Sequence, residues 1–131
     1  MSSFLLDTHV ILWLATDPSR VPVRVRRSLS AAENIVLSAA SAYEIAQKTR
    51  SGRLPHGDRV LDRWDDLVNA LLGSELPLTT RHMRTAGELA WDHRDPFDRM
   101  LVAQARLEGL TLATEDERIR DYSGVTCAEW S

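Results

Sequence analysis

The sequence predicts an α/β fold, a three-layer α/β/α sandwich around a mainly parallel sheet of about five strands. Short apolar runs alternate along the chain with longer amphipathic segments, which is the pattern of strands joined by crossover helices. No internal repeat, low-complexity segment or long linker interrupts this alternation. Because 131 residues are the usual size of one compact domain, we expect a single domain over residues 1–131.

Short apolar runs mark the expected strands. They are residues 4–6, 35–37, 76–78, 110–113 and 125–127, the last as an edge strand. Parallel strands joined by crossover helices end at one edge of the sheet. The ligand sites of such sheets lie at those carboxyl ends, so this edge is where we look for a functional site.

Helical spacing of apolar residues and helix stop signals define the connecting helices. The leucine stripe around Trp64 recurs at helical spacing until Gly73 ends it. Pro96 suits the first position of a later helix, which Gly109 ends. The expected helices follow Asp7 as far as the turn at Asp17, and then cover residues 22–33, 38–49, 61–72, 80–91 and 96–108.

The overall charge does not mark the chain as a nucleic-acid binder, because the formal net charge is −3. Lys48 is the only lysine among the 16 lysine and arginine residues. This arginine bias suits phosphate recognition, and GC-rich coding also produces it. A single cysteine, Cys127, excludes an internal disulfide, and no Cys/His grouping offers a structural zinc site. We therefore expect a protein of a reducing compartment, the cytoplasm.

The apolar N-terminal stretch is interpreted as a buried strand that enters a helix. It has no basic segment before it, and Asp7 and His9 interrupt it, so it does not fit a signal peptide. No apolar run approaches the roughly 20 residues that a bilayer span needs. We expect no membrane association.

Asp7 and Asp116 each follow a predicted strand at its carboxyl end. Asp7 opens the next helix, where a capping role also explains an aspartate. Asp116 comes after residues 110–113, and Thr114 with Glu117 matches a capping box. With the cap filled by those residues, the carboxylate of Asp116 is free to face a site, although a solvated acidic turn is the alternative.

Glu44 and Asp98 lie near the starts of two buried helices. Ser41 and Glu44 match a capping box, but Glu44 also stands among small and apolar residues, where a carboxylate needs a compensating cation. Near Asp98, the position of Pro96 makes Asp95 the natural N-cap. Asp98 is therefore left without a capping role at the start of an apolar helix.

Taken together, the four acids indicate a metal site. Asp7, Glu44, Asp98 and Asp116 all fall at strand ends or helix starts on one edge of the sheet. Carboxylates gathered there repel one another unless divalent cations bind them. Mg²⁺ or Mn²⁺ fits oxygen ligands without a thiolate or histidine cluster. Such sites hydrolyse phosphodiester bonds, because bound ions activate water and stabilise the attacking and leaving oxygens.

A phosphotransfer domain that uses Asp7 is the alternative from another class of enzyme. Phosphatases of that kind need Asp-x-Asp after the first strand, where this chain has Asp7-Thr8-His9. Receiver domains need a lysine on a late strand, and the only lysine is Lys48. Both departures weigh against this alternative.

At these same acids the chain resembles the PIN-domain nucleases, and specifically the VapC-type toxins of bacterial toxin–antitoxin pairs. Four segments carry the resemblance, in order and over nearly the whole chain. They are LLDTH (5–9), LSAASAYEIAQK (37–48), DPFDRMLVAQA (95–105) and LATED (112–116). The resemblance implies a PIN-like fold and a metal-dependent endoribonuclease, in which metal-activated water hydrolyses RNA without a covalent intermediate.

The resemblance also implies roles for individual residues. The catalytic and metal-binding acids are Asp7, Glu44, Asp98 and Asp116, with Thr8, Ser38 and Thr114 as polar supports. Arg99, next to Asp98, is the candidate for contact with RNA phosphates.

The expected partners are an RNA substrate, a second copy in a homodimer, and a VapB-like antitoxin whose C-terminal segment covers the active site. Trp13 and Trp64 fit either the core or the antitoxin groove. A housekeeping RNA-processing nuclease remains open, because catalytic motifs do not encode toxicity. A non-catalytic PIN-like module would lack some of the four acids, and none is missing.

Overall fold

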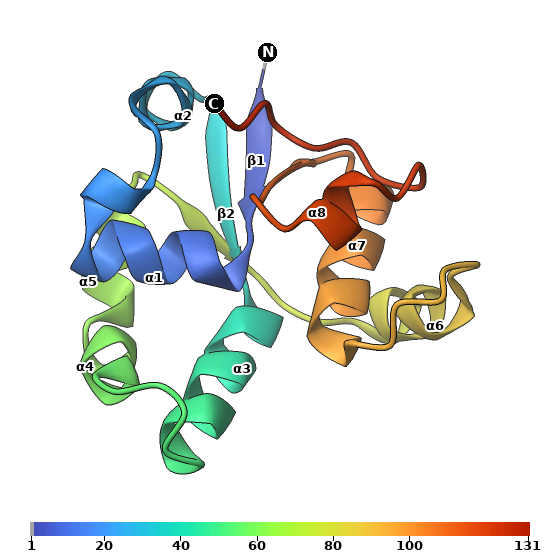
Figure 1. Cartoon of the computed structure of the whole chain (residues 1–131), viewed down its shortest axis with the longest axis horizontal. Helices are drawn as coiled ribbons and strands as arrows, with labels where there is room; N and C mark the ends of the chain where they lie inside the picture. Colours follow the sequence, from blue (N-terminus) through green and yellow to red (C-terminus); the bar gives the residue numbers. More distant parts are fainter. Residues whose placement is uncertain (1) are drawn as a thin grey trace.

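The sheet at the centre of the fold is parallel, as the sequence predicts. The computed structural model describes residues 2–131, and within them four strands form one sheet in the order β3-β2-β1-β4. The strands are β1 (Ser3–Leu6), β2 (Asn34–Ser38), β3 (Ser74–Leu76) and β4 (Thr111–Ala113). In Figure 1, β1 and β2 run side by side through the centre, with helices to either side.

The helices connect these strands as crossovers. They are α1 (Thr8–Thr16), the 3₁₀ helix η1 (Pro18–Arg20), α2 (Val23–Ser30), α3 (Ala39–Arg50), α4 (Gly57–Asp62), α5 (Trp64–Ala70), α6 (Thr80–Glu88), α7 (Pro96–Glu108) and α8 (Glu117–Arg120). None of the helices formed by residues 2–131 combines the length and hydrophobicity that a bilayer span requires.

Both faces of the sheet are covered, so the expected three-layer sandwich is confirmed. Phe4 and Leu6 of β1 pack on one face in a cluster with Ile11 of α1 and side chains of α2, α4 and α5. Leu5 points to the other face and packs with Leu101 of α7 and with α8. Figure 1 shows these two groups of helices on opposite sides of the sheet. The central residues of β1, β2 and β4 are thus buried, as is usual for parallel sheets, whereas β3 at the edge is largely exposed.

The expected edge strand at residues 125–127 is reduced to a single bridge. Leu112 of β4 pairs with Cys127, and its backbone donates to Thr126 O (2.8 Å) and accepts from Ala128 N (2.9 Å). β4 itself has only three residues, which limits the ladder that a neighbour can form. The Arg120 guanidinium then donates to Ala128 O (2.6 Å), so this carbonyl does not extend the ladder. The prediction of about five strands is corrected to four within the described residues.

Three helices differ in extent from the expected ranges. The helix expected over residues 22–33 covers only Val23–Ser30 and is followed by Ala31 at its C-cap. The helix expected over residues 61–72 starts at Gly57 and breaks at Arg63, whose φ of −107° interrupts the helical geometry between α4 and α5. The helix expected over residues 80–91 ends at Glu88, because Leu89 turns to extended backbone (ψ 130°).

Helix α7 has the ends that its sequence predicts. The side chain of Asp95 accepts hydrogen bonds from the backbone N–H groups of Phe97 (2.9 Å) and Asp98 (3.3 Å), with Pro96 at the first turn. Gly109 ends the helix in the left-handed region (φ 67°), where a side chain would cost energy. The N-terminal cap thus fixes the position of Asp98 in the first turn of α7.

A buried polar bridge ties α7 to β2. Gln104 is fully buried, its amide oxygen accepts a hydrogen bond from the Ser38 hydroxyl (2.5 Å), and its amide nitrogen donates to Pro77 O (3.3 Å). The Ser38 Oγ also accepts from Ala40 N (3.0 Å) and so caps α3. One glutamine therefore links the end of β2, the start of α3 and the middle of α7.

We expect Gln104→Leu to lower the free energy of unfolding by about 1–3 kcal/mol, because it leaves a buried hydroxyl and carbonyl without their partner. Urea denaturation followed by circular dichroism measures this change. Gln47→Leu, at an exposed position of α3, is the matched control and should change stability by less than about 0.5 kcal/mol. Equal losses in the two variants would contradict the bridge.

Candidate active site

Asp7 leaves β1 at its carboxyl end with its carboxylate buried in the fold. Its backbone N–H donates to Ala113 O (3.0 Å), which continues the pairing of β1 with β4. Although Asp7 occupies the N-cap position of α1, its side chain makes no capping hydrogen bond. Its Oδ2 instead accepts from the Thr114 hydroxyl (2.6 Å), and the residue is 2% exposed. The capping interpretation is thus wrong, and the carboxylate is held toward the end of β4.

Thr114 and Asp116 follow β4 and lie next to Asp7 at this edge of the sheet. The Thr114 hydroxyl donates to Asp7 and accepts from Asp116 N (3.0 Å). The half-buried Asp116 caps α8 itself, because its Oδ1 accepts from Arg118 N (2.9 Å). The capping box expected from Thr114 and Glu117 is therefore wrong. Asp116 combines a capping role with a place at the site.

Glu44 lies in the second turn of α3 with both of its oxygens engaged. Its Oε1 is 2.7 Å from the Thr8 hydroxyl, and its Oε2 accepts from Lys48 Nζ (2.6 Å). The carboxylate is nearly fully buried, so this ion pair compensates most of its desolvation. The expected capping box of Ser41 with Glu44 is wrong, because Ser38 caps α3 one turn earlier. Of the three polar supports, Thr8 contacts Glu44 and Thr114 contacts Asp7, whereas Ser38 supports the backbone.

Asp98 lies in the first turn of α7, 7% exposed, and its Oδ2 is 2.6 Å from His93 Nε2. Burial raises the pKa of the Asp98 carboxyl to about 6, the hydrogen bond with His93 opposes this rise, and the carboxylates of Asp7, Asp95 and Asp116 add to it. The charges of Asp7, which follows β1, and Asp116, which follows β4, therefore act on Asp98 at the start of α7. A group of carboxylates with this mutual repulsion is a donor set that fits a divalent cation.

His9 connects the two sides of the site. Its pKa is raised, first by the neighbouring side chain of Asp7 and further by the charge of Glu44, while burial and Lys48 oppose the rise. Its side chain is 54% exposed, and its Nδ1 is 3.7 Å from Asp7 Oδ2. Glu44 and Asp7 thus face the same imidazole, although Glu44 already has a cationic partner.

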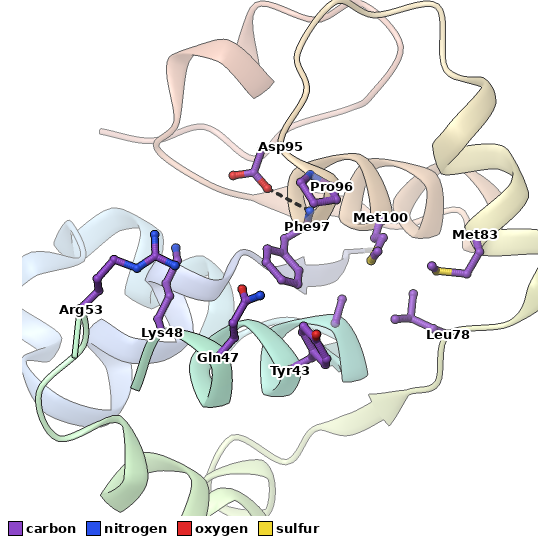
Figure 2. Close-up of a pocket in the computed structure, with 11 residues that line it drawn as sticks. Tyr43, Gln47, Lys48, Arg53, Leu78, Met83, Asp95, Pro96, Phe97 and Met100 are labelled. Carbon is purple, nitrogen blue, oxygen red and sulfur yellow. Dashed lines mark hydrogen bonds between the residues drawn. The ribbon is translucent and has the colours of Figure 1, made fainter. Parts of the chain in front are cut away.

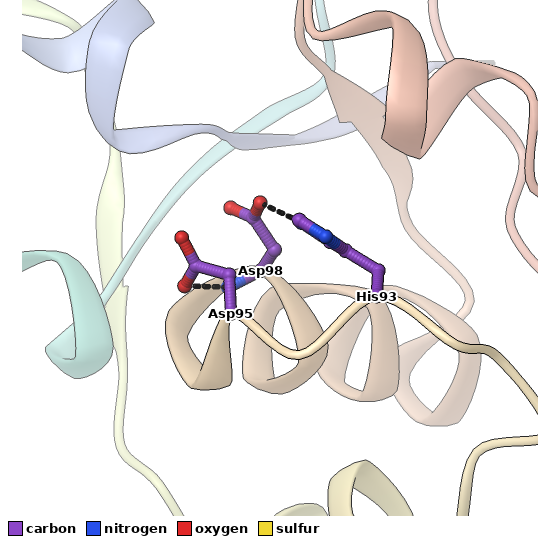
Figure 3. A group of neighbouring side chains, drawn as sticks. All are labelled: His93, Asp95 and Asp98. Atoms are coloured by element: carbon purple, nitrogen blue, oxygen red, sulfur yellow. Dashed lines mark hydrogen bonds and ion pairs between the residues drawn. The ribbon is translucent and has the colours of Figure 1, made fainter.

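The sequence-based interpretation missed His93. Among residues 2–131, the His93, Asp95 and Asp98 ligand atoms form a group within 4.8 Å of one another, and Figure 3 shows the three side chains together at the start of α7. The motif DPFD drew attention to the aspartates. The histidine that precedes it gave no separate signal, because a lone histidine in a loop is most often unremarkable.

Arg99 does not reach the site. All five of its guanidinium N–H donors go to backbone carbonyls of the segment that leaves α6. The acceptors are the carbonyls of Ala86 (2.9 Å), Gly87 (3.4 Å), Leu89 (2.8 Å), Trp91 (2.7 Å) and His93 (3.0 Å). The predicted contact of Arg99 with RNA phosphates is corrected, because no donor is left for a phosphate.

Comparison with known proteins agrees with the family resemblance of the sequence motifs. The family model described as the PIN domain matches residues 4–125. The chain is also similar to the Ribonuclease VapC22 of Mycobacterium tuberculosis, with 28% identity over 123 residues that cover 93% of each chain.

Solved structures share the fold at low sequence identity. The crystal structure of VapBC2 from Rickettsia felis bound to a fragment of promoter DNA superposes with a TM-score of 0.73 at 13% identity, covering 98% of each chain. DNA-bound VapBC from Salmonella typhimurium gives a TM-score of 0.70 at 20% identity over 100% of each chain. The expected PIN-like architecture is confirmed by these likenesses.

The raised pKa of Asp98 makes a prediction for stability without metal. In the folded protein this pKa is about 6, above its usual 3.8, so the neutral form is favoured by folding. Wild-type stability in EDTA therefore falls as pH rises from about 4 to 6, and Asp98→Asn lacks this loss. Urea denaturation between pH 4 and 8 measures the growing difference. Asp92→Asn, at a 98% exposed side chain, should show the same change of stability with pH as wild type. A difference in stability between Asp98→Asn and wild type that is equal at every pH would contradict the raised pKa of Asp98.

Proposed function

The chain belongs to the PIN domain family, and from this premise we propose that it is a metal-dependent endoribonuclease, the toxin of a VapBC-type toxin–antitoxin pair. The observation that supports the proposal is that the charges of Asp7, which follows β1, and Asp116, which follows β4, act on the buried Asp98 at the start of α7, whose pKa is raised to about 6. The similarity to a ribonuclease supports RNA as the substrate.

The carboxylates of Asp7, Asp98 and Asp116, together with that of Glu44, would hold Mg²⁺ or Mn²⁺. Such an ion would supply Lewis-acid chemistry at a phosphate oxygen and would activate water for hydrolysis. The donor set consists of hard oxygen atoms, which match these ions better than Zn²⁺ or Cu²⁺.

The chain's own residues keep these carboxylates oriented. The Thr114 hydroxyl fixes one oxygen of Asp7, and His93 fixes one oxygen of Asp98. Thr8 and Lys48 together hold Glu44. The acids are therefore preorganised before any ligand arrives, which reduces the reorganisation needed at the reacting phosphate.

An antitoxin partner is proposed because the structural neighbours are themselves toxin–antitoxin complexes. A groove of about 770 Å³ lies between α1, α4 and α5, with apolar Leu14, Val60 and Leu67 beside charged Arg59 and Asp66. An extended or helical antitoxin segment fits such an elongated, mixed surface. Because α1 begins at the site, a segment in this groove can continue to the acids.

The two tryptophans considered for this groove differ. Trp64 is 9% exposed, and its indole N–H donates to Glu75, so it is a core residue. Trp13 is half-buried, lies 6.5 Å from the ring of Trp130, and carries Arg20 over its face at 4.7 Å. Only Trp13 remains a candidate for antitoxin contact.

A homodimer is proposed through a second groove of about 680 Å³ between α3, α6 and α7. Tyr43 is 63% and Met83 is 44% exposed here, and Figure 2 shows them with Phe97 and Met100 around the same depression. The rings of Tyr43 and Phe97 lie 5.7 Å apart. Apolar side chains from three helices, with polar Gln47 and charged Lys48 and Arg53 beside them, offer a surface suited to an isologous contact with a second copy.

Activity on RNA tests the main proposal. Purified wild-type protein should cleave RNA with Mg²⁺ or Mn²⁺ and lose the activity in EDTA. Asp7→Asn and Asp98→Asn should each lower the rate by a factor of about 100 or more, because each removes a charge that would hold the ion. Asp92→Asn is the control for an exposed aspartate. Cleavage that persists in EDTA or in both variants would falsify the mechanism.

Sedimentation tests the dimer. Tyr43→Glu and Met83→Glu place charges on the apolar groove, so each should shift the protein from dimer to monomer at micromolar concentration in analytical ultracentrifugation. Leu72→Glu is the matched control, because Leu72 is 90% exposed and does not line this groove. A wild-type monomer, or a dimer unaffected by both groove variants, would rule out this interface.

A further inference from the structure

His93 is a buried histidine that the catalytic motifs leave unexplained. It precedes α7, is 9% exposed, and its Nε2 lies 2.6 Å from Oδ2 of Asp98. Figure 3 shows the second oxygen of Asp98 turned away from the imidazole. The imidazole thus occupies one oxygen of a proposed metal ligand and leaves the other available.

The position of His93 is fixed from several directions. Arg99 Nη1 donates to its backbone carbonyl (3.0 Å). Its ring packs against Trp91 at a centroid distance of 4.8 Å, and Trp91 in turn stacks on Tyr122 at 4.6 Å with the planes 6° apart. The imidazole therefore reaches Asp98 without losing further conformational freedom when a ligand binds.

The environment of the second ring nitrogen selects one tautomer. His93 Nδ1 is buried and has no hydrogen-bond partner within the part of the chain that the structure describes. A proton on Nδ1 would leave a buried N–H donor unsatisfied, which is costly. The proton therefore belongs on Nε2, where it is donated to the carboxylate of Asp98.

A direct metal-ligand role fits the geometry less well. His93 Nε2 already bonds to Asp98, and Asp95 Oδ1 already accepts the backbone N–H groups of Phe97 and Asp98. The nitrogen that a metal would need is thus occupied, and Nδ1 is buried away from solvent.

We propose that His93 is a positioning residue for metal binding: its Nε2–H holds one oxygen of Asp98 and thereby directs the other oxygen to the divalent ion. This inference rests on the proposed metal-dependent function. Residues that hydrogen-bond to a metal ligand orient it, and their loss typically weakens metal affinity by about 10–100-fold.

Mn²⁺ affinity measured by isothermal titration calorimetry tests this role without relying on catalysis. His93→Phe keeps the ring against Trp91 but removes the donor, so it should weaken Mn²⁺ binding about 10–100-fold. His93→Gln retains an amide donor and should restore part of the affinity. His82→Phe is the matched control, because His82 is also buried but bonds to Glu108 on α7, and its Mn²⁺ affinity should equal that of wild type.

A second background separates positioning from general structural support. In an Asp98→Asn protein, adding His93→Phe should not weaken Mn²⁺ binding further, because the carboxylate on which His93 acts is gone. An equal additional loss in that background, or unchanged affinity in His93→Phe, would overturn the proposal. A nitrogen coupling to bound Mn²⁺ in pulsed EPR that disappears in His93→Phe would also overturn it in favour of direct ligation.

Nuclear magnetic resonance of the wild-type protein provides a test that needs no variant to fold. The ¹⁵N shifts of the His93 ring should show a proton on Nε2 and none on Nδ1, and the opposite tautomer would contradict the proposal. Wild-type protein that binds Mn²⁺ in a His93-dependent way but leaves RNA intact would refute the ribonuclease function and retain the positioning role. Failure of wild type to bind Mn²⁺ would refute the positioning role.

Discussion

The parallel register of β1 against β4 determines where the functional groups lie. Leu6 pairs with Ala113, and the next step of the ladder is the bond from Asp7 N to Ala113 O (3.0 Å). Asp7 and Thr114 consequently leave the sheet at the same level, where their side chains meet at 2.6 Å. A shift of one residue would turn Asp7 away from Thr114, since alternate residues of a strand point to opposite faces. The site is thus a direct product of strand pairing.

Charge compensation is unequally distributed over the four acids. Glu44 carries its own counter-ion, because Lys48 lies 2.6 Å away on the same helix. Burial raises the pKa of the Asp98 carboxyl to about 6, the hydrogen bond with His93 opposes this rise, and the neighbouring carboxylates add to it. The negative charges of Asp98, Asp7 and Asp116 are therefore the ones that a bound cation would compensate. A metal ion that binds Glu44 would have to compete with Lys48 for its carboxylate.

Local signals in the sequence predicted what local geometry decides. The ends of α7 followed from Asp95, Pro96 and Gly109, and the positions of β1, β2 and β4 along the chain followed from short apolar runs. The errors arose where a side chain bonds to a residue outside its own helix. Asp7 bonds across the fold to Thr114 instead of capping α1, and Arg99 binds carbonyls of the preceding loop.

The five hydrogen bonds of Arg99 have a consequence for how this protein can vary. They hold residues 86–93, a stretch that contains the end of α6 and no further regular structure. A lysine at this position offers three donors on a flexible stem and cannot satisfy the same set of carbonyls. Substitutions at the exposed positions of the stretch, such as Glu88 and Asp92, leave these bonds in place, because the guanidinium contacts only main-chain atoms. Variation at these exposed positions and retention of the arginine are therefore compatible outcomes of one contact.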